Sequence, residues 1–517
     1  MTAILEEKDR NIVPRWRDFT TTVELQELTQ PVSRRKPLDR VREQNIEVQH
    51  IAFEENKSLS FAGDLISAAL VSGNSTVANS AAEFVLNEGA ENSSEALLTL
   101  AKRILGNPKL PTFELVSATV GSGQHTSSRQ IAELRCSLRN APHDAIQWMD
   151  LAYLFAINGL NAKAERAARI AHKIAPSNRF ILRSSARCFL HLQDFKEAHR
   201  IVRRSPNISN DPWIAAAEIA VASAAGYPPF SVREGRGMMS SDRFPNHDLS
   251  ELASALSTLD LKSGSIGKAR KWLRQSLRAP NENSLAQAKW ISRGIFGVPM
   301  DVKVADYVVP RPYEARAFEA FVKGDWSLSA KCAVSWFEDQ PFSSRPAEFA
   351  SYIIGSLIED HWESERIVKR GLIASPDDFG LNVNLAFDYV STRRLIEAKA
   401  QLVKCRQLQG PEWASAVILA NYGLIAYQEK DPVAGRIFYG EAVTEAESLK
   451  DKKTLLSALV YFARAEMEYD LENADNYLRR AEALAKDQHK ADTERLINLA
   501  KDKRNAILGR NLSFPIK

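Results

Sequence analysis

The sequence predicts an all-α protein, built as an α-solenoid of stacked antiparallel helical hairpins. Two observations lead to this prediction. Residues 145–178 carry apolar side chains at steps of three or four, with Gly159 between two such stretches and Pro176 after the second. These steps are typical of amphipathic helices, and Gly and Pro are common where helices end. The same pattern returns 34 residues later, which indicates a repeat.

A single hairpin of this size cannot bury its apolar face, so neighbouring hairpins must cover it. The positions that recur after 34 residues hold small or aromatic side chains. They are Ala152 and Ala186, Phe155 and Phe189, Ala164 and Ala198, and later Ser364 and Ala398. Near the end the spacing lengthens, from Ala398 to Gly435 and from Gly435 to Ala474, which predicts longer helices or turns there.

The block at 145–178 resembles the tetratricopeptide repeat in its period and in its signature positions. Those positions are Trp148, Leu151, Ala152, Phe155, Ala164, Ala171 and Pro176. The resemblance is specific over 145–210 and 345–487. It implies a right-handed superhelix with a concave groove that binds a partner.

Helical stretches are expected in pairs along most of the chain, because each has helical periodicity and a Gly or Pro near its end. They are 60–73 with 76–89, 93–106 with 128–142, the blocks 145–178 and 179–210, 211–226 with the weaker 230–242, the pair within 249–280, 284–297, and the pairs within 313–340, 345–376, 379–408, 414–448 and 454–487, before a last helix at 491–509. Two stretches break the pattern: 107–127 is rich in Gly, Ser and Pro, and 298–312 holds three prolines and a β-branched run.

We therefore divide the chain into six parts. They are an irregular N-terminal arm (1–57), N-terminal helical pairs (58–142), a first array (143–297), a linker or kink (298–312), a second array (313–490), and a capping helix with a tail (491–517). One stretch of the arm, "IVPRWRDF" at 12–19, gathers Val13, Trp16 and Phe19 around a proline. It either packs back onto the array or binds a partner.

Composition favours a folded protein of the cytoplasm. The charged fraction is 26% and the net charge is only +4, which gives no argument for a nucleic-acid partner. No apolar run is long enough to cross a membrane, and the N-terminus lacks the apolar core of a secretory signal. The four cysteines are isolated, so we expect neither disulfides nor a redox motif.

Motifs for catalysis, metals and cofactors are missing from the sequence. No phosphate-binding loop, serine-hydrolase elbow or HExxH motif occurs. "EDHWESE" (359–365) offers two of its glutamates as candidate metal ligands together with His361, but its register puts it at a turn between helices, where such pairs are common. We therefore expect a protein that is not an enzyme and that uses no cofactor and no metal.

The groove of the array is the predicted binding site. In each first helix, one stripe faces the stack and a second stripe faces the concave surface. Asn384 and Asn421 fall at the same position of that second stripe, where amides can bond a peptide backbone while apolar neighbours bury its side chains. The predicted partner-binding residues are Tyr153, Arg183, Arg187, Asn384, Phe387, Asn421, Leu424 and Tyr427.

The favoured function is a scaffold that binds a partner peptide or protein in the groove. One alternative is a regulatory or sensor subunit that holds a partner enzyme in a multi-protein system, such as a defence system. Another is an RNA-binding helical repeat, for which the only local indication is an arginine cluster: Arg183, Arg187, Arg200, Arg203 and Arg204. The sequence fixes neither the partner nor the oligomeric state.

Overall fold

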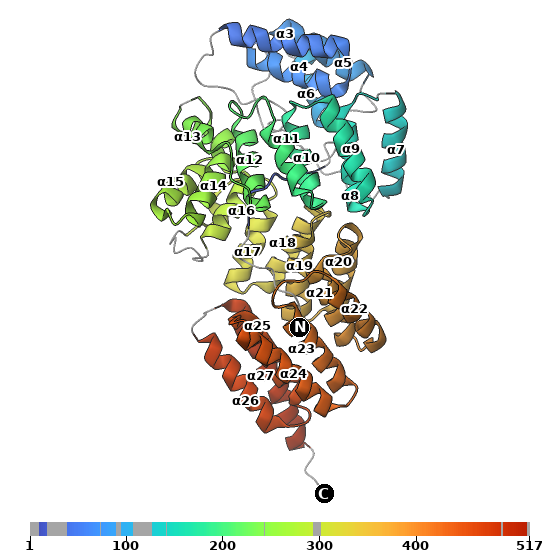
Figure 1. The fold of residues 1–517 in the computed structure, drawn as a ribbon, viewed down its shortest axis with the longest axis vertical. Coiled ribbons are helices and arrows are strands. Elements are labelled where there is room, and N and C mark those ends of the chain that lie inside the picture. Colours follow the sequence, from blue (N-terminus) through green and yellow to red (C-terminus); the bar gives the residue numbers. More distant parts are fainter. Residues whose placement is uncertain are drawn as a thin grey trace. The chain divides into compact units, whose positions relative to one another are not determined.

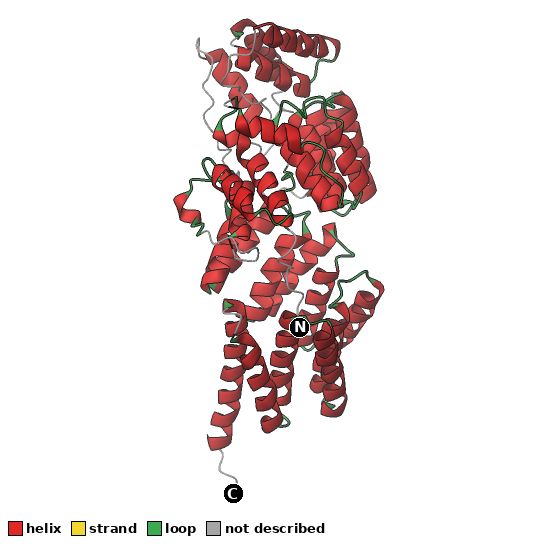
Figure 2. Cartoon of the chain, turned by 60° about the vertical axis from the view of Figure 1, so that its left-hand side comes forward, coloured by secondary structure: helices red, strands yellow, loops and turns green. Residues whose placement is uncertain are grey.

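The computed structural model describes residues 10–17, 39–72, 74–88, 95–106, 127–140, 142–241, 243–292, 301–486 and 490–513. Throughout these ranges the chain is helix, turn or loop, and no strand occurs in them (Figure 2). The helices form antiparallel hairpins that stack on their neighbours (Figure 1). The prediction of an all-α, tetratricopeptide-like solenoid is confirmed.

The chain divides into two compact units, with the division between Pro312 and Tyr313. We call Lys8–Pro312 the N-terminal unit and Tyr313–Lys517 the C-terminal unit. The helices of the N-terminal unit are α3 (Asp39–Glu55), α4 (Leu59–Ser72), α5 (Ser75–Glu88), α6 (Glu95–Gly106), α7 (Ser127–Asn140), α8 (Ala145–Ile157), α9 (Asn161–Ile174), α10 (Arg179–His191), α11 (Phe195–Arg203), α12 (Pro212–Ala225), α13 (Val232–Ser240), α14 (Asn246–Lys262), α15 (Ile266–Ser276), α16 (Glu282–Ile291) and the 3₁₀ turn η1 (Val304–Asp306).

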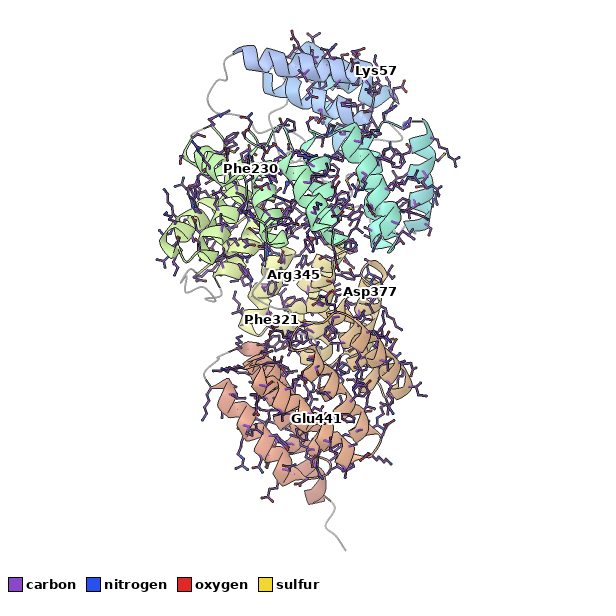
Figure 3. The ribbon with its side chains drawn as sticks, viewed as in Figure 1. Lys57, Phe230, Phe321, Arg345, Asp377 and Glu441 are labelled. Carbon is purple, nitrogen blue, oxygen red and sulfur yellow. The ribbon has the colours of Figure 1, made fainter. Side chains whose placement is uncertain are left out.

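The C-terminal unit continues with hairpins of the same kind. Its helices are α17 (Tyr313–Lys323), α18 (Trp326–Asp339), α19 (Ser344–Ser351), the π-helix η2 (Tyr352–Ile358), α20 (His361–Ala374), α21 (Phe379–Ser391), α22 (Leu395–Gln407), α23 (Ala414–Gln428), α24 (Pro432–Ser448), α25 (Lys452–Glu466), α26 (Leu471–Ala485) and α27 (Ala491–Ser513). Aromatic rings fill part of its core: Phe321, which Figure 3 labels, lies 5.5 Å from Trp326 and 5.3 Å from Phe349, ring centre to ring centre.

Aspartates start many of these helices. Each accepts hydrogen bonds from backbone N–H groups of the first turn, which have no partner within the helix. The capping residues are Asp144, Asp194, Asp211, Asp325, Asp360, Asp378, Asp431, Asp451 and Asp470. Proline follows two of them as the first helical residue, where its missing N–H costs nothing.

The small residues at the recurring repeat position allow paired helices to approach closely. Ala164, Ala198, Ser364 and Ala398 are all fully buried at the 34-residue spacing. In these four hairpins the second helix therefore packs closely on the first. This is the arrangement that the repeat pattern predicted.

The structure corrects two expectations about local structure. Residues 39–55 form helix α3, so the prediction of an irregular arm is wrong for this stretch. Although α3 is polar overall, Phe53 is buried and meets Phe84 of α5 edge-on at 5.1 Å, and α3 also packs on α4. In the stretch 345–376, the first helix changes into a π-helix at Tyr352–Ile358 instead of staying α-helical.

The six-part division of the chain stays a prediction. Within 301–312, the described part of the predicted linker, the chain holds only the short turn η1. The Lys289 ammonium group donates to the carbonyl oxygen of Val302 at 2.8 Å, which ties this stretch to α16. No helix in the described part of the chain is long and apolar enough to cross a membrane.

Candidate peptide-binding groove

Residues 10–17 form neither helix nor strand and lie against the helices of the N-terminal unit. Figure 1 shows them in dark blue beside α16. The Asn283 side-chain amide donates to the carbonyl oxygen of Val13 at 3.0 Å, and the Gln287 amide donates to the carbonyl oxygen of Arg10 at 3.1 Å. Both amides come from α16. One helix thus holds this segment by its backbone.

Two apolar side chains anchor the segment. Trp16 is fully buried, and its ring meets the ring of Tyr153 edge-on at 5.4 Å. Ile12 is also buried and joins an apolar cluster with residues of α12 and α14, such as Ile219 and Leu252. Burying a large apolar side chain contributes about 1.5–3 kcal/mol relative to leaving it exposed. These two residues therefore supply much of the contact energy.

Two arginines of the segment meet polar partners on α16. The Arg17 guanidinium lies 2.8 Å from a carboxylate oxygen of Glu282, and both side chains are at most 10% exposed. Arg10 donates to the side-chain oxygen of Asn283 at 3.2 Å and to that of Gln287. Charged hydrogen bonds away from water are strong, and removing one partner leaves the other buried and unsatisfied. The segment is therefore recognised by charge as well as by shape.

A carboxylate on α14 organises the groups that hold the segment. Glu251 is buried and accepts hydrogen bonds from Asn281 at 2.9 Å, from Asn283 at 3.3 Å and from Arg183 at 2.6 Å. The Arg183 guanidinium also lies over the ring of Trp213, 4.5 Å from its centre. Glu251 thus links α10 to α16 and orients the amide that bonds Val13.

We call the surface around residues 10–17 the segment-binding groove, and define it by Tyr153, Glu251, Glu282, Asn283 and Gln287. Among the residues predicted from the sequence, Tyr153 contacts the segment directly. Arg183 contacts it only indirectly, because it bonds Glu251, which bonds the Asn283 amide. Arg187 lies half-buried on α10. Binding of a partner by these three residues stays a prediction.

Most of the arginine cluster that suggested RNA binding is occupied within the chain. Arg183 is paired with Glu251, and Arg200 is paired with Glu197 at 2.6 Å. The Arg203 guanidinium lies over the ring of Phe230, which Figure 3 labels, at 5.2 Å. Another basic surface occurs on α15, where a hollow of about 230 Å³ is lined by Arg270, Lys271, Arg274 and Arg278 among others. The RNA-binding alternative stays a prediction.

The C-terminal unit has a hollow of about 210 Å³ on the surface that we predicted as its groove. Phe387 and Leu424, both predicted from the sequence, line it together with Tyr461. Polar groups border the same hollow: His361, Gln428, Arg464 and Lys503. The Arg464 guanidinium is paired with Glu359 at 2.5 Å, so the positive charge is partly neutralised. Partner binding here stays a prediction.

His361, which the sequence placed at a turn, belongs to a buried polar group. Its Nδ1 lies 3.1 Å from one carboxylate oxygen of Asp388, and the Ser364 hydroxyl donates to the other at 2.7 Å. Burial raises the pKa of Asp388, and the hydrogen bond from His361 opposes the shift. The serine contacts the aspartate and not the imidazole, so this is not the geometry that activates a serine nucleophile. The group braces α20 against α21.

The structure corrects the predicted placement of Asn384, Asn421 and Tyr427. Both asparagines are fully buried and Tyr427 is 5% exposed, so they do not line an open surface. Asn384 donates to the Ser351 hydroxyl at 2.9 Å, and Asn421 donates to the carbonyl oxygen of Val417 in its own helix. The reason is that other helices cover α21 and α23 on more sides than the prediction assumed. The side chains at these positions are therefore buried instead of facing a concave surface. Substituting these asparagines is therefore expected to affect stability.

Sequence reasoning missed the three groove residues of α16: Glu282, Asn283 and Gln287. The sequence predicts only a helical stretch over 284–297, which begins after Glu282 and Asn283. A signal for the other side of the contact did exist, since Trp16 and its neighbours were the apolar exception in the arm. Nothing local in the sequence connects that stretch to residues about 270 positions later.

No protein-family model matches the chain, and no curated protein sequence matches it. Solved structures with a similar course of the chain do exist. The human IFIT1 dimer with PPP-AAAA is 14% identical, covers 87% of this chain and 95% of its own, and has a TM-score of 0.32. The Cut9–Hcn1 hetero-tetramer of APC/C is 11% identical, covers 90% of this chain and 87% of its own, and has a TM-score of 0.43. Yeast Tom70 is 11% identical, covers 92% of this chain and 96% of its own, and has a TM-score of 0.28. These values are too low to support an inference about function.

Proposed function

We propose that the chain is a protein-interaction scaffold whose N-terminal unit binds a linear peptide in the segment-binding groove. One observation carries the proposal: the groove already holds residues 10–17 by their backbone carbonyl groups. Side-chain amides that bond a peptide backbone, beside a buried aromatic contact, are what a peptide-binding site needs. The same chemistry was predicted from the sequence, at other asparagines.

The segment is suited to being a ligand and not only a part of the fold. It lies outside every helix, so it can leave the groove without breaking helical hydrogen bonds. Pro14 fixes its own backbone angle and disfavours helix at Val13, which lowers the entropy lost when such a peptide is ordered. A regulatory subunit that holds a partner enzyme would use the same groove and would differ only in its partner.

A synthetic peptide with the sequence of residues 8–19 tests the proposal. In the full-length chain, Trp16→Ala removes the main anchor of the resident segment and should free the groove. We expect the labelled peptide to bind this variant about tenfold more tightly than wild type, because a larger fraction of the groove is open. Fluorescence anisotropy measures the two dissociation constants.

A scrambled peptide of the same composition is the control for charge alone, and circular dichroism checks that the variant keeps its helices. Adding Gln287→Leu to the Trp16→Ala chain should remove the binding. If the peptide binds neither wild type nor the Trp16→Ala chain in a saturable way, the groove is not a peptide site and the proposal is wrong.

A further inference from the structure

The segment-binding groove contacts four side chains of residues 10–17, which lie at a defined spacing in the sequence. Arg10 meets the two amides of α16, Ile12 enters the apolar cluster, Trp16 meets Tyr153, and Arg17 meets Glu282. Between Trp16 and the first arginine lie five residues, and the second arginine of this set follows the tryptophan directly. The backbone contacts accept many sequences, whereas these four contacts do not. The groove therefore has the elements of sequence selectivity.

We infer that the external ligand of the groove is a basic linear segment of a partner protein, with an arginine, an aliphatic residue two positions later, and a Trp-Arg pair six and seven positions later. Residues 10–17 occupy the site in competition with it. The inference rests on the proposed function, and it adds the chemistry of the partner and the resident competitor.

Charge complementarity supports a basic occupant. The segment carries three arginines and no acidic residue, and the groove offers the carboxylate of Glu282, with that of Glu251 behind it. A peptide without the final arginine would lose the charged hydrogen bond to the buried Glu282, which weakens binding strongly. Lysine is a poorer substitute, since its ammonium group is more strongly hydrated than a guanidinium and therefore costs more to bury. The site should therefore prefer Arg to Lys, and both to Ala.

The polar lining also argues against a groove that is permanently closed. A fixed internal contact gains more from apolar side chains than from buried charges, because charges lose their hydration. Beside the apolar anchors Trp16 and Ile12, the contact here includes Glu282, Asn283 and Gln287, which are all polar. Buried polar groups that find partners only with the right sequence give discrimination between ligands. This is expected where the occupant can be exchanged.

Occupancy by residues 10–17 lowers the apparent affinity for any partner. A ligand that binds only the open groove sees its affinity reduced by the open fraction. Weak or incorrect ligands therefore fail to displace the segment, and a partner with the full pattern succeeds. Residues 10–17 thus set a minimum affinity that a partner needs in order to bind.

A double-mutant cycle between peptide and protein tests the selectivity. The peptide of residues 8–19 and its Arg17→Ala and Arg17→Lys forms are titrated against the full-length Trp16→Ala chain, with and without Glu282→Gln. With Glu282 present, Arg17→Ala in the peptide should weaken binding about 30-fold and Arg17→Lys by less. With Glu282→Gln, the loss from Arg17→Ala should shrink to about threefold. Glu165→Gln, an exposed carboxylate on α9, is the matched control and should change nothing.

The results separate the two proposals. If no form of the peptide binds, the proposed function fails. If the peptides bind but Arg17→Ala costs the same in chains with and without Glu282→Gln, the selectivity inference fails alone. Comparing the three peptides needs no further change in the protein. Equal affinity of the Arg, Lys and Ala peptides for the Trp16→Ala chain therefore also overturns the selectivity inference.

Hydrogen exchange in the wild-type chain tests the competition. Saturating peptide should raise exchange in residues 10–17, because the segment is displaced. Continued protection of these residues while the peptide is bound would contradict the resident-competitor role. A concentration-dependent dimer of the wild-type chain that Trp16→Ala abolishes would show that the occupant is a second copy, and would overturn the assignment to a partner protein.

Discussion

Replacing Glu466 by alanine is expected to lower the free energy of unfolding of the C-terminal unit by about 2–4 kcal/mol. Glu466 is fully buried at the end of α25 and accepts hydrogen bonds from two other helices. The Tyr427 hydroxyl of α23 donates to one carboxylate oxygen, and Arg436 of α24 donates to the other. One side chain thus joins three consecutive helices.

The size of the effect depends on which group is left without a partner. Arg436 is 41% exposed, so water can replace its lost contact. Tyr427 is buried, and leaving its hydroxyl unsatisfied costs about 1–3 kcal/mol, to which the cavity left by the side chain adds. Burial, together with the hydrogen bond to Glu466, raises the pKa of Tyr427 well above its ordinary value, so the hydroxyl remains a donor at any working pH.

Chemical denaturation followed by circular dichroism measures this change. Glu447→Ala is the matched control, because Glu447 forms an exposed pair with Arg480 in the same unit. Exposed pairs contribute about 0–1 kcal/mol. Equal effects of Glu466→Ala and Glu447→Ala would show that Glu466 is not a structural link.

The helical hairpins could be predicted because their cause is local. Each helix has its own periodicity, and each hairpin repeats a small residue where its two helices meet. The turns between helices could not be predicted in the same way. Gly159 has a positive φ of 69°, but the equivalent turn positions in other hairpins hold Gln193, Glu359 and Arg393, with φ of 60°, 70° and 61°. A left-handed backbone is unfavourable for these residues, so the packing of the flanking helices must impose it.

That side-chain amides bond backbone carbonyl groups could be predicted better than where they do so. The sequence suggested amides that bond a peptide backbone, and a tryptophan segment able to pack onto the array. Asn283 and Gln287 bond backbone carbonyl groups of residues 10–17, and Trp16 packs onto the helices, whereas Asn384 and Asn421 bond groups of the helices themselves. These amide side chains are all buried, and they look alike in a helical pattern. Which of them meets a peptide depends on contacts between distant parts of the chain, and a single sequence does not record these.

Gly435 is expected to be as sensitive to substitution as a large core residue. The recurring repeat position is alanine or serine in other hairpins, but in α24 it is glycine. A Cβ atom on Gly435 would lie 2.6 Å from two ring atoms of Tyr427. Glu466 holds that ring by its hydroxyl, so the ring cannot move aside without losing a buried hydrogen bond. The ring takes the space that a methyl group occupies elsewhere.

Gly435→Ala should therefore lower the free energy of unfolding by about 3 kcal/mol, at the upper end for overpacking. Gly440→Ala in the same helix is the matched control, because the added Cβ has no atom within 4 Å apart from its chain neighbours and the backbone of its own helix. Alanine favours helix over glycine, so this variant should be more stable than wild type by about 0.5–1 kcal/mol. The same substitution at two positions 5 residues apart in α24 is thus expected to change the free energy of unfolding in opposite directions. This difference separates the effect of packing from that of helix propensity. Stabilisation by both variants in denaturant titrations would mean that Tyr427 has room to shift, and it would also weaken the link assigned to Glu466.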